Sequence, residues 1–289
     1  MDGVAKLILS RSDFTVGCTG TLLSSTAGDY VLTAAHCVSD DFGSNIFVTG
    51  TATFEGINGS ETITITGVNI HPDWDGSIIR GNDVAVLTLT HRPGAEINSY
   101  DIDRSSKSDV GSISEKSGYG LSGIEKIDSS FGFGTKINGM NRYDAAADIM
   151  LNALGLRGGR DFVRNSVLQY DFDDGTADHD AFGFFFGIHD TGLGNDEVSS
   201  APGDSGGSTI KDGIIQGVTS YGLSLVFNDG RSSDTTPEII DSSIGEFAGD
   251  THVAIYASWI DSVTGGVSTS SDTTTPTKCN RRQQMLGNC

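Results

Sequence analysis

The chain has 289 residues, which is enough for one or two domains and for a sizeable buried core. Hydrophobic residues make up 36% and the 39 glycines follow no fixed period, which argues against a disordered chain or a repeat architecture and favours an all-β protein with many turns. The formal net charge of −20 makes nucleic acid a poor partner, and no apolar run approaches the roughly 20 residues that span a bilayer.

The first part of the chain alternates short apolar runs with turns such as Gly28-Asp29, Gly43-Ser44 and Asn58-Gly59. The runs are rich in β-branched residues, and several show a period of two. Six strands at this spacing, with no helix between them, predict a closed antiparallel barrel or a sandwich. The predicted strands are Val4–Leu9, Gly20–Leu23, Tyr30–Thr33, Ile46–Phe54, Thr62–Ile70 and Val84–Leu89.

The next part of the chain is less regular. Residues 91–118 are polar and predict a passage between two β units, and the strand pattern returns at Gly213–Tyr221. Between them, the alanine-rich run Tyr143–Leu154 favours a helix, Tyr170–Asp180 is an acidic loop, and Phe182–Phe186 is a dense apolar run.

The last predicted element is a helix over His252–Val263. Its large apolar side chains fall on one face, Asp250 or Thr251 is suited to be the N-cap, and Gly265 follows the last turn. The Ser/Thr/Gly tract Thr264–Thr277 predicts a flexible tail.

The chain contains four cysteines, Cys18, Cys37, Cys279 and Cys289, and none of them forms a C-x-x-C pair. Two widely separated pairs favour two disulfides and an oxidising compartment over four free thiols in a reducing cytosol. We expect Cys18 to pair with Cys37, and Cys279 to pair with Cys289 across the short tail.

The most specific local motif is Gly203-Asp204-Ser205-Gly206-Gly207. A serine hydroxyl becomes a strong nucleophile when a base removes its proton and backbone N–H groups receive the oxyanion. Flanking glycines let the backbone turn tightly with its N–H groups pointing outward. A Gly/Ser turn without chemistry is the alternative for a serine between glycines, but the aspartate before Ser205 makes the whole motif much rarer.

A histidine and an aspartate complete this chemistry. In Thr33–Cys37 (TAAHC), His36 follows a predicted strand directly, with small residues before it and a cysteine after it. In Asn82–Leu87 (NDVAVL), Asp83 lies at the mouth of an apolar strand, where a buried carboxylate would hold an imidazole in one tautomer. Each motif alone is weak, but together with Ser205 they predict a catalytic triad.

With these motifs, the sequence resembles the chymotrypsin/trypsin family of serine proteases, whose chain order is histidine, aspartate, serine. The resemblance runs from about Val4 to Val263 and looks closest to secreted bacterial members. The stretches that carry it are Cys18–Leu23, Thr33–Cys37, Asn82–Leu87, Gly203–Gly207, Ser220–Gly222, the terminal helix, and the bacterial-type Gly134–Lys136 and Asn141–Asp144.

The resemblance implies an all-β fold of two six-stranded antiparallel β-barrels, with the site in the cleft between them and a C-terminal helix. We expect an N-terminal barrel over residues 1–110 with the histidine and aspartate, a second barrel over 111–263 with the serine, and a tail over 264–289. The aspartate and serine are 122 positions apart, about 30 more than a compact family member needs, which places loop insertions in 119–200.

The family also implies residue roles. His36 would act as general base and then as general acid, Asp83 as its orienting partner, and Ser205 as the nucleophile of peptide-bond hydrolysis. The backbone N–H groups of Gly203 and Ser205 would form the oxyanion hole. The run Ser220-Tyr221-Gly222 would pair with the substrate backbone as an added strand.

Specificity and activation follow from departures from the family pattern. Ser199, six positions before the nucleophile, would line the base of the primary pocket, and a serine there predicts cleavage after large apolar or aromatic residues. The alternative is that Asp229 enters the pocket and restores a preference for basic residues. No Ile-Val-Gly-Gly-like start is found, so the partner of Asp204, which in the family is a new N-terminal ammonium, stays open.

The expected setting is extracellular. No signal peptide is visible, since Met1 leads directly into Asp2-Gly3-Val4. We interpret Met1 as an expression or processing boundary rather than as evidence for the cytosol, and we expect that a signal peptide has been removed. We expect protein or peptide substrates, no nucleic acid partner, no membrane span, no required cofactor, and a monomer by default.

Two acidic stretches are candidates for a structural calcium ion. The first does not match an EF-hand because Gly175 occupies a ligand position, and the second lies where the family often has a calcium loop. The alternative is a solvated acidic loop that binds no ion. The two sets are Asp171, Asp173, Asp174, Asp178 and Asp180, and Glu55, Asn58 and Glu61.

Two other functions compete with an active protease. An inactive homologue that keeps the fold for binding is disfavoured because all three triad residues are present. An acidic, calcium-binding β-sandwich adhesin explains the charge and the Thr/Ser tail but leaves the three motifs as coincidence.

Overall fold

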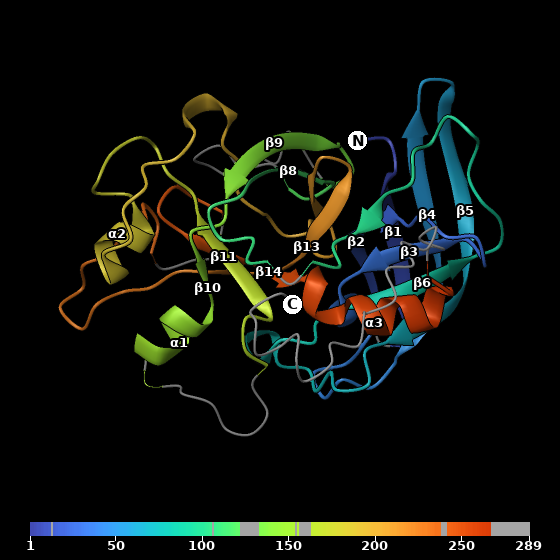
Figure 1. The fold of residues 1–289 in the computed structure, drawn as a ribbon, viewed down its shortest axis with the longest axis horizontal. Helices are drawn as coiled ribbons and strands as arrows, with labels where there is room; N and C mark the ends of the chain where they lie inside the picture. The colour runs from blue at the N-terminus through green and yellow to red at the C-terminus, as the bar shows by residue number, and fades with distance from the viewer. Residues whose placement is uncertain are drawn as a thin grey trace, which may run out of the picture.

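The structure is a computed structural model that describes residues 1–12, 14–105, 107–121, 133–153, 155, 163–237 and 242–266. It contains two β units that lie next to each other (Figure 1). Among the described helices, none has both the length and the apolar character needed to cross a membrane. The predicted tail and the cysteines Cys279 and Cys289 lie outside the described residues.

The first β unit is a closed, six-stranded antiparallel barrel with the strand order β1-β2-β3-β6-β5-β4. The barrel confirms the prediction from alternating apolar runs. In β4, for example, Ala52 and Phe54 are fully buried while the residues between and beside them are more exposed. The strands are β1 (Val4–Arg11), β2 (Thr15–Leu22), β3 (Tyr30–Thr33), β4 (Phe47–Gly56), β5 (Gly59–Ile70) and β6 (Ala85–Leu89).

The described strands of the second unit form one curved sheet in the order β10-β11-β14-β13-β12-β8-β9, with β7 paired in parallel to β13. The sheet stays open, which differs from the closed second barrel expected from the sequence. The two edge strands of this sheet, β9 and β10, follow each other in the chain and are connected by Tyr143 and Asp144. They lie at opposite ends of the strand order and do not pair with each other. The strands are β7 (Asp101–Ile102), β8 (Ile113–Gly118), β9 (Ile137–Arg142), β10 (Ala145–Ala146), β11 (Val167–Asp171), β12 (Ser208–Lys211), β13 (Ile214–Leu223) and β14 (Phe247–His252).

In the described parts of the chain, three α-helices and three short 3₁₀ helices accompany the strands. The alanine-rich run becomes a helix only from Asp148, because Ala145 and Ala146 form β10. The dense apolar run Phe182–Phe186 is also helical, and Asp180 is the N-cap of that helix. The helices are α1 (Asp148–Ala153), α2 (Ala181–Phe186), α3 (Val253–Thr264), η1 (Ala35–Cys37), η2 (Ile78–Arg80) and η3 (Gly194–Asp196).

Helix α3 confirms the predicted terminal helix and connects the two units. Its N-cap is His252, the last residue of β14, rather than Asp250 or Thr251, which lie further inside that strand. Its buried face packs into the core cluster of the first barrel. The hydroxyl of Tyr256 also accepts a hydrogen bond from the N–H of Asn82 at 2.7 Å, which fixes the backbone just before Asp83.

Candidate active site

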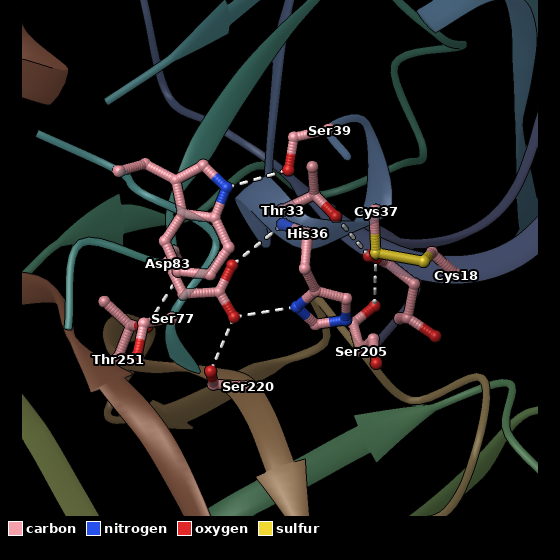
Figure 2. A network of polar contacts seen from close by, with 12 residues as sticks. Cys18, Thr33, His36, Cys37, Ser39, Ser77, Asp83, Ser205, Ser220 and Thr251 are labelled. Atoms are coloured by element: carbon pink, nitrogen blue, oxygen red, sulfur yellow. Dashed lines mark hydrogen bonds and ion pairs between the residues drawn. A yellow bond between two sulfur atoms is a disulfide. The ribbon is translucent and has the colours of Figure 1, made fainter. Parts of the chain in front are cut away.

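The structure brings His36 and Asp83 together at one end of the first barrel. His36 lies in η1, directly after β3, and Asp83 lies two residues before β6, which pairs with β3. The His36 ring Nδ1 is 2.7 Å from Asp83 Oδ2, and the His36 backbone N–H donates to Asp83 Oδ1 at 2.9 Å (Figure 2). Both oxygens of the carboxylate therefore hold the same histidine, which fixes the ring orientation.

Burial and charge act in opposite directions on this pair. Burial alone would lower the pKa of His36, but the charge of Asp83 and its hydrogen bond raise it above 6.5. Burial alone would raise the pKa of Asp83, yet the charge of His36 and the hydrogen bonds to the carboxylate hold it below its usual range. The Asp83 carboxylate is fully buried while the His36 imidazole is 30% exposed. Asp83 is therefore shielded from solvent, whereas the His36 ring is accessible to a substrate.

Two hydroxyl groups from the second β unit complete the surroundings of Asp83. Ser220 Oγ donates to Asp83 Oδ2 at 2.5 Å, and Thr251 Oγ1 donates to the Asp83 carbonyl at 2.9 Å (Figure 2). Ser220 was predicted as a substrate-binding residue, and it also positions the carboxylate. Thr251 was missed, because a threonine in a strand carries no sequence signal for such a contact.

Ser205 is held against the loop that carries His36. Its carbonyl accepts a hydrogen bond from the Thr19 N–H at 2.8 Å and lies 3.7 Å from Cys37 Sγ. Within the described chain no hydrogen bond joins Ser205 Oγ to the His36 ring, as is common for triads without substrate. The structure thus places all three predicted triad residues at one site, as Figure 2 shows.

The backbone around Ser205 has the shape that an oxyanion hole needs. Gly203 has a φ of +102°, which favours glycine, and a Cβ there would lie 3.0 Å from the Gly120 Cα. The N–H groups of Gly206 and Gly207 are used within the fold, by the carbonyls of Thr219 and Asp204. No hydrogen bond among the described residues uses the N–H of Gly203 or Ser205, so both can receive an oxyanion.

Asp204 is satisfied by backbone N–H groups. Its Oδ1 accepts from Gly120 at 2.7 Å and its Oδ2 accepts from Ala201 at 2.9 Å. Burial raises the pKa of Asp204, while the two N–H donors and the nearby Lys116 oppose that rise. These contacts answer the question left open by the sequence, because they hold the segment before Ser205 without an N-terminal ammonium.

The Cys18–Cys37 disulfide forms as predicted, with an S–S distance of 2.06 Å. The disulfide joins β2 to η1, so Cys37, the residue after His36, is bonded to β2. Thr19 of the same strand donates a hydrogen bond to the Ser205 carbonyl, so β2 contacts both segments of the site.

The predicted substrate-binding run lies on a free strand edge. On one side of β13, Tyr221 and Gly222 pair with Gly249 and Ala248 of β14. On the other side, pairing with β12 ends at Val218, so among the described strands none occupies the edge of Ser220–Leu223. The Tyr221 ring packs on Gly249 and its hydroxyl accepts a hydrogen bond from Gln169, so this side chain supports the strand.

Ser199 lines a small cavity with Ser200, Lys116 and Asp204. Both charged groups there are engaged, Asp204 by backbone N–H groups and Lys116 by Asp250 at 2.6 Å. Asp229, the alternative pocket residue, is exposed and pairs with Arg231 at 3.0 Å.

Comparison with known proteins agrees with this geometry. Residues 4–141 match the family model described as Trypsin, a match that includes His36 and Asp83 and ends before Ser205. The matched residues include all of the first β unit, and the fold of the chain is that of the chymotrypsin-like serine proteases. Among solved structures, this trypsin-like chain is similar to neuropsin, a serine protease expressed in the limbic system of mouse brain, with a TM-score of 0.58 and 17% identity. It is also similar to HL collagenase, with a TM-score of 0.56 and 19% identity. Each match covers 91% of this chain and 94% of the other, which extends the shared fold to the second β unit.

Proposed function

We propose that this trypsin-like chain is a secreted serine endopeptidase with His36, Asp83 and Ser205 as its catalytic triad. The observation that carries the proposal is the fully buried Asp83 carboxylate, which holds both the ring and the backbone of His36 next to the loop of Ser205. The Cys18–Cys37 disulfide supports an oxidising, extracellular setting.

The hydrogen bonds support one direction of proton transfer, because an ionised Asp83 carboxylate can only accept a hydrogen bond from His36. Because Nδ1–H of His36 donates to Asp83, the Nε2 atom is left to accept the Ser205 hydroxyl proton. Ser205 Oγ then bonds to the substrate carbonyl carbon, and the oxyanion is received by the N–H groups of Gly203 and Ser205. The protonated His36 returns its proton to the leaving amine, which yields an acyl-enzyme. A water molecule activated by His36 releases the acid and restores Ser205.

The free edge of β13 supports an extended substrate. A peptide that lies antiparallel along Ser220–Leu223 would exchange backbone hydrogen bonds with a strand that has no partner on that side. This mode uses the main chain and suits a broad range of protein substrates.

Primary specificity in this proposal favours large apolar or aromatic side chains. Ser199 is uncharged, and the charged groups that share its cavity are already paired. No free carboxylate there would compensate for desolvation of an arginine or lysine. Paired peptide substrates that differ only by Phe or Arg before the cleaved bond test this, and an Arg preference above about tenfold would overturn it.

The function itself is tested with a fluorophosphonate probe, which reacts only with an activated serine. Wild-type protein should be labelled at Ser205, and both Ser205→Ala and His36→Ala should lose the label while keeping the wild-type circular dichroism spectrum. An unlabelled wild-type protein would instead support an inactive homologue that uses the same fold for binding.

A further inference from the structure

A second cluster of charged groups lies away from the candidate triad, around the loop that connects β11 to α2 in the second β unit (Figure 1). Asp171 is the last residue of β11, Asp173 follows it, and Asp180 is the N-cap of α2. One carboxylate oxygen of each lies within 4.8 Å of the others. Their exposed fractions are only 1%, 5% and 1%.

The charges of this cluster are not balanced by cationic side chains. In the part of the chain that the structure describes, no lysine or arginine forms an ion pair with Asp171, Asp173 or Asp180. The nearest positively chargeable group is the largely exposed His189, whose Nδ1 is 3.2 Å from Asp180 Oδ2. Buried carboxylates are normally paired or bound to a metal, because their desolvation is costly.

One oxygen in the cluster has no hydrogen-bond partner among the residues that the structure describes. Asp171 Oδ2 accepts from the Phe182 N–H at 2.8 Å, and Asp180 Oδ1 accepts from the Gly183 N–H at 2.6 Å. Asp173 Oδ1 is buried, and among the described residues no donor reaches it. A buried acceptor without a donor, within 4.8 Å of two other carboxylates, is the environment that a cation would satisfy.

Two further acidic residues approach the cluster from other parts of the chain. Glu197, just after η3, accepts hydrogen bonds from the N–H groups of Asp173 and Leu193. Asp144, between β9 and β10, contacts the Asp171 carboxyl. Both carboxyl groups therefore lie directly against the three-residue cluster.

The backbone is shaped to the cluster as well. A Cβ on Gly192, which has a φ of +81°, would lie 2.0 Å from Glu197 Oε2 and 2.7 Å from Asp173 Cβ. A Cβ on Gly183 would lie 2.1 Å from Asp180 Oδ2. Both glycines therefore let loops close tightly around the carboxylates.

We propose that Asp171, Asp173 and Asp180 bind one structural Ca²⁺ ion. All of the side-chain ligands are carboxylate oxygens, and no cysteine or histidine belongs to the three-residue group. Such hard oxygen ligands favour Ca²⁺ or Mg²⁺ over zinc or copper. Mg²⁺ usually keeps several waters, whereas this cluster offers three carboxylates in a buried setting, so Ca²⁺ fits better.

This site revises the sequence-based candidates. Asp174 and Asp178 are exposed and do not join the group, and Asp174 binds Thr176 and His179 instead. In the first barrel, Glu61 is occupied by His91 and by the Gly94 N–H.

The ion would stabilise the segment that leads to the nucleophile. Asn141 Nδ2 donates both to the Asp171 carbonyl at 2.8 Å and to the Val198 carbonyl at 2.9 Å. Val198 precedes Ser199, and its N–H donates to the Met140 carbonyl at 3.0 Å. Any effect of Ca²⁺ on cleavage rests on the proposed protease function, so the test below measures binding and stability.

The test uses the full chain in a Ser205→Ala background, so that self-cleavage cannot contribute. Calorimetric titration with CaCl₂ should show that one ion binds per chain. In a separate melting experiment, Ca²⁺ at about 100 times its Kd should raise Tm by roughly 5–10 °C relative to the protein in chelator. Asp173→Asn should weaken Ca²⁺ binding about tenfold or more and remove most of this rise. In chelator the same variant should be at least as stable as its parent, because it removes a repelling charge.

Asp178→Asn is the matched control, because it removes one charge from the same loop at an exposed position and should keep the full response. Equal melting temperatures in Ca²⁺ and chelator would overturn the proposal. A Ca²⁺ response that survives in Asp173→Asn, or disappears equally in Asp178→Asn, would overturn the location, and an equal response to MgCl₂ would overturn the choice of ion. None of these outcomes depends on labelling of Ser205, so the two proposals fail separately.

Discussion

At the scale of single residues, the candidate site depends on how one carboxylate is surrounded. Asp83 accepts hydrogen bonds from the His36 ring, the His36 N–H and the Ser220 hydroxyl, all within 2.9 Å. A carboxylate with three donors stays ionised although it is fully buried. It therefore keeps a negative charge next to the imidazole, which in the proposed mechanism gains a proton from Ser205.

The first prediction concerns the nucleophile and the base. Ser205→Ala and His36→Ala should each lower kcat for a peptide ester by roughly 10⁴-fold or more, since triad members act as a unit. The double variant should lose little beyond either single variant. Steady-state kinetics on proteins with unchanged melting temperature provide the measurement, and additive losses would show that the two residues do not act in one step.

The second prediction is a pH profile. His36 is inactive as a base while protonated, so kcat/KM should rise with pH through the pKa of His36. Because Asp83 raises that pKa, the midpoint should lie above 6.5. Asp83→Asn should lower the rate about 10⁴-fold and move the remaining midpoint to lower pH. A profile that stays flat between about pH 5 and 9 would contradict a histidine base.

At the scale of elements, β2 is the strand on which the site is assembled. It carries Cys18, which is bonded to η1, and Thr19, which binds the carbonyls on either side of Asp204. The sequence pattern places only Gly20–Leu23 in this strand, whereas the strand begins at Thr15. Before Gly20, only Val16 and Cys18 alternate with threonine and glycine, which is too short a pattern to predict a strand. Pairing with β1 holds this segment extended.

The third prediction tests the disulfide as part of this element. Replacing both Cys18 and Cys37 with alanine should lower the free energy of unfolding by roughly 3 kcal/mol, because the bond closes a loop with a sequence separation of 19. Activity should fall as well, since η1 would no longer be fixed to β2. Urea unfolding measures the first effect, and a loss below about 0.5 kcal/mol would contradict the stabilising role.

At the scale of the whole molecule, the site exists only where the two β units meet. The first barrel supplies His36 and Asp83, and the second unit supplies Ser205 together with Ser220 and Thr251, which hold Asp83. Contacts between the units therefore determine the reacting geometry as directly as contacts within either of them.

The fourth prediction tests one such contact. Thr19 Oγ1 donates to the Gly203 carbonyl at 2.9 Å and accepts from the Tyr119 N–H at 3.1 Å, so Thr19→Val removes both bonds at nearly constant volume. We expect a loss of about 1–3 kcal/mol in unfolding free energy and a fall in kcat that exceeds the change in KM, because Gly203 belongs to the proposed oxyanion hole.

Thr21→Val is the matched control for this variant. Thr21 is equally buried in the same strand, but its Oγ1 has no hydrogen-bond partner among the described residues. The control should be neutral or slightly stabilising, and it should keep wild-type kinetics. Equal kinetic losses in both variants would show that any change in this strand is harmful and that the Thr19 bonds have no special role.

The sequence by itself predicted the first barrel, the terminal helix and the Cys18–Cys37 pair, and it proposed the three candidate triad residues that the structure brings together. Local alternation of apolar residues reflects one-sided burial, and the motifs around His36 and Ser205 are short enough to be complete within a few residues. Only the tertiary structure decided the partners of Asp204, the role of Thr251 and the association of Glu197 with Asp173, because these contacts join residues that are distant in the chain or backbone groups that every residue carries. It also decided that β9 and β10 stay unpaired at the two ends of the described second sheet, because strand pairing depends on how distant segments pack.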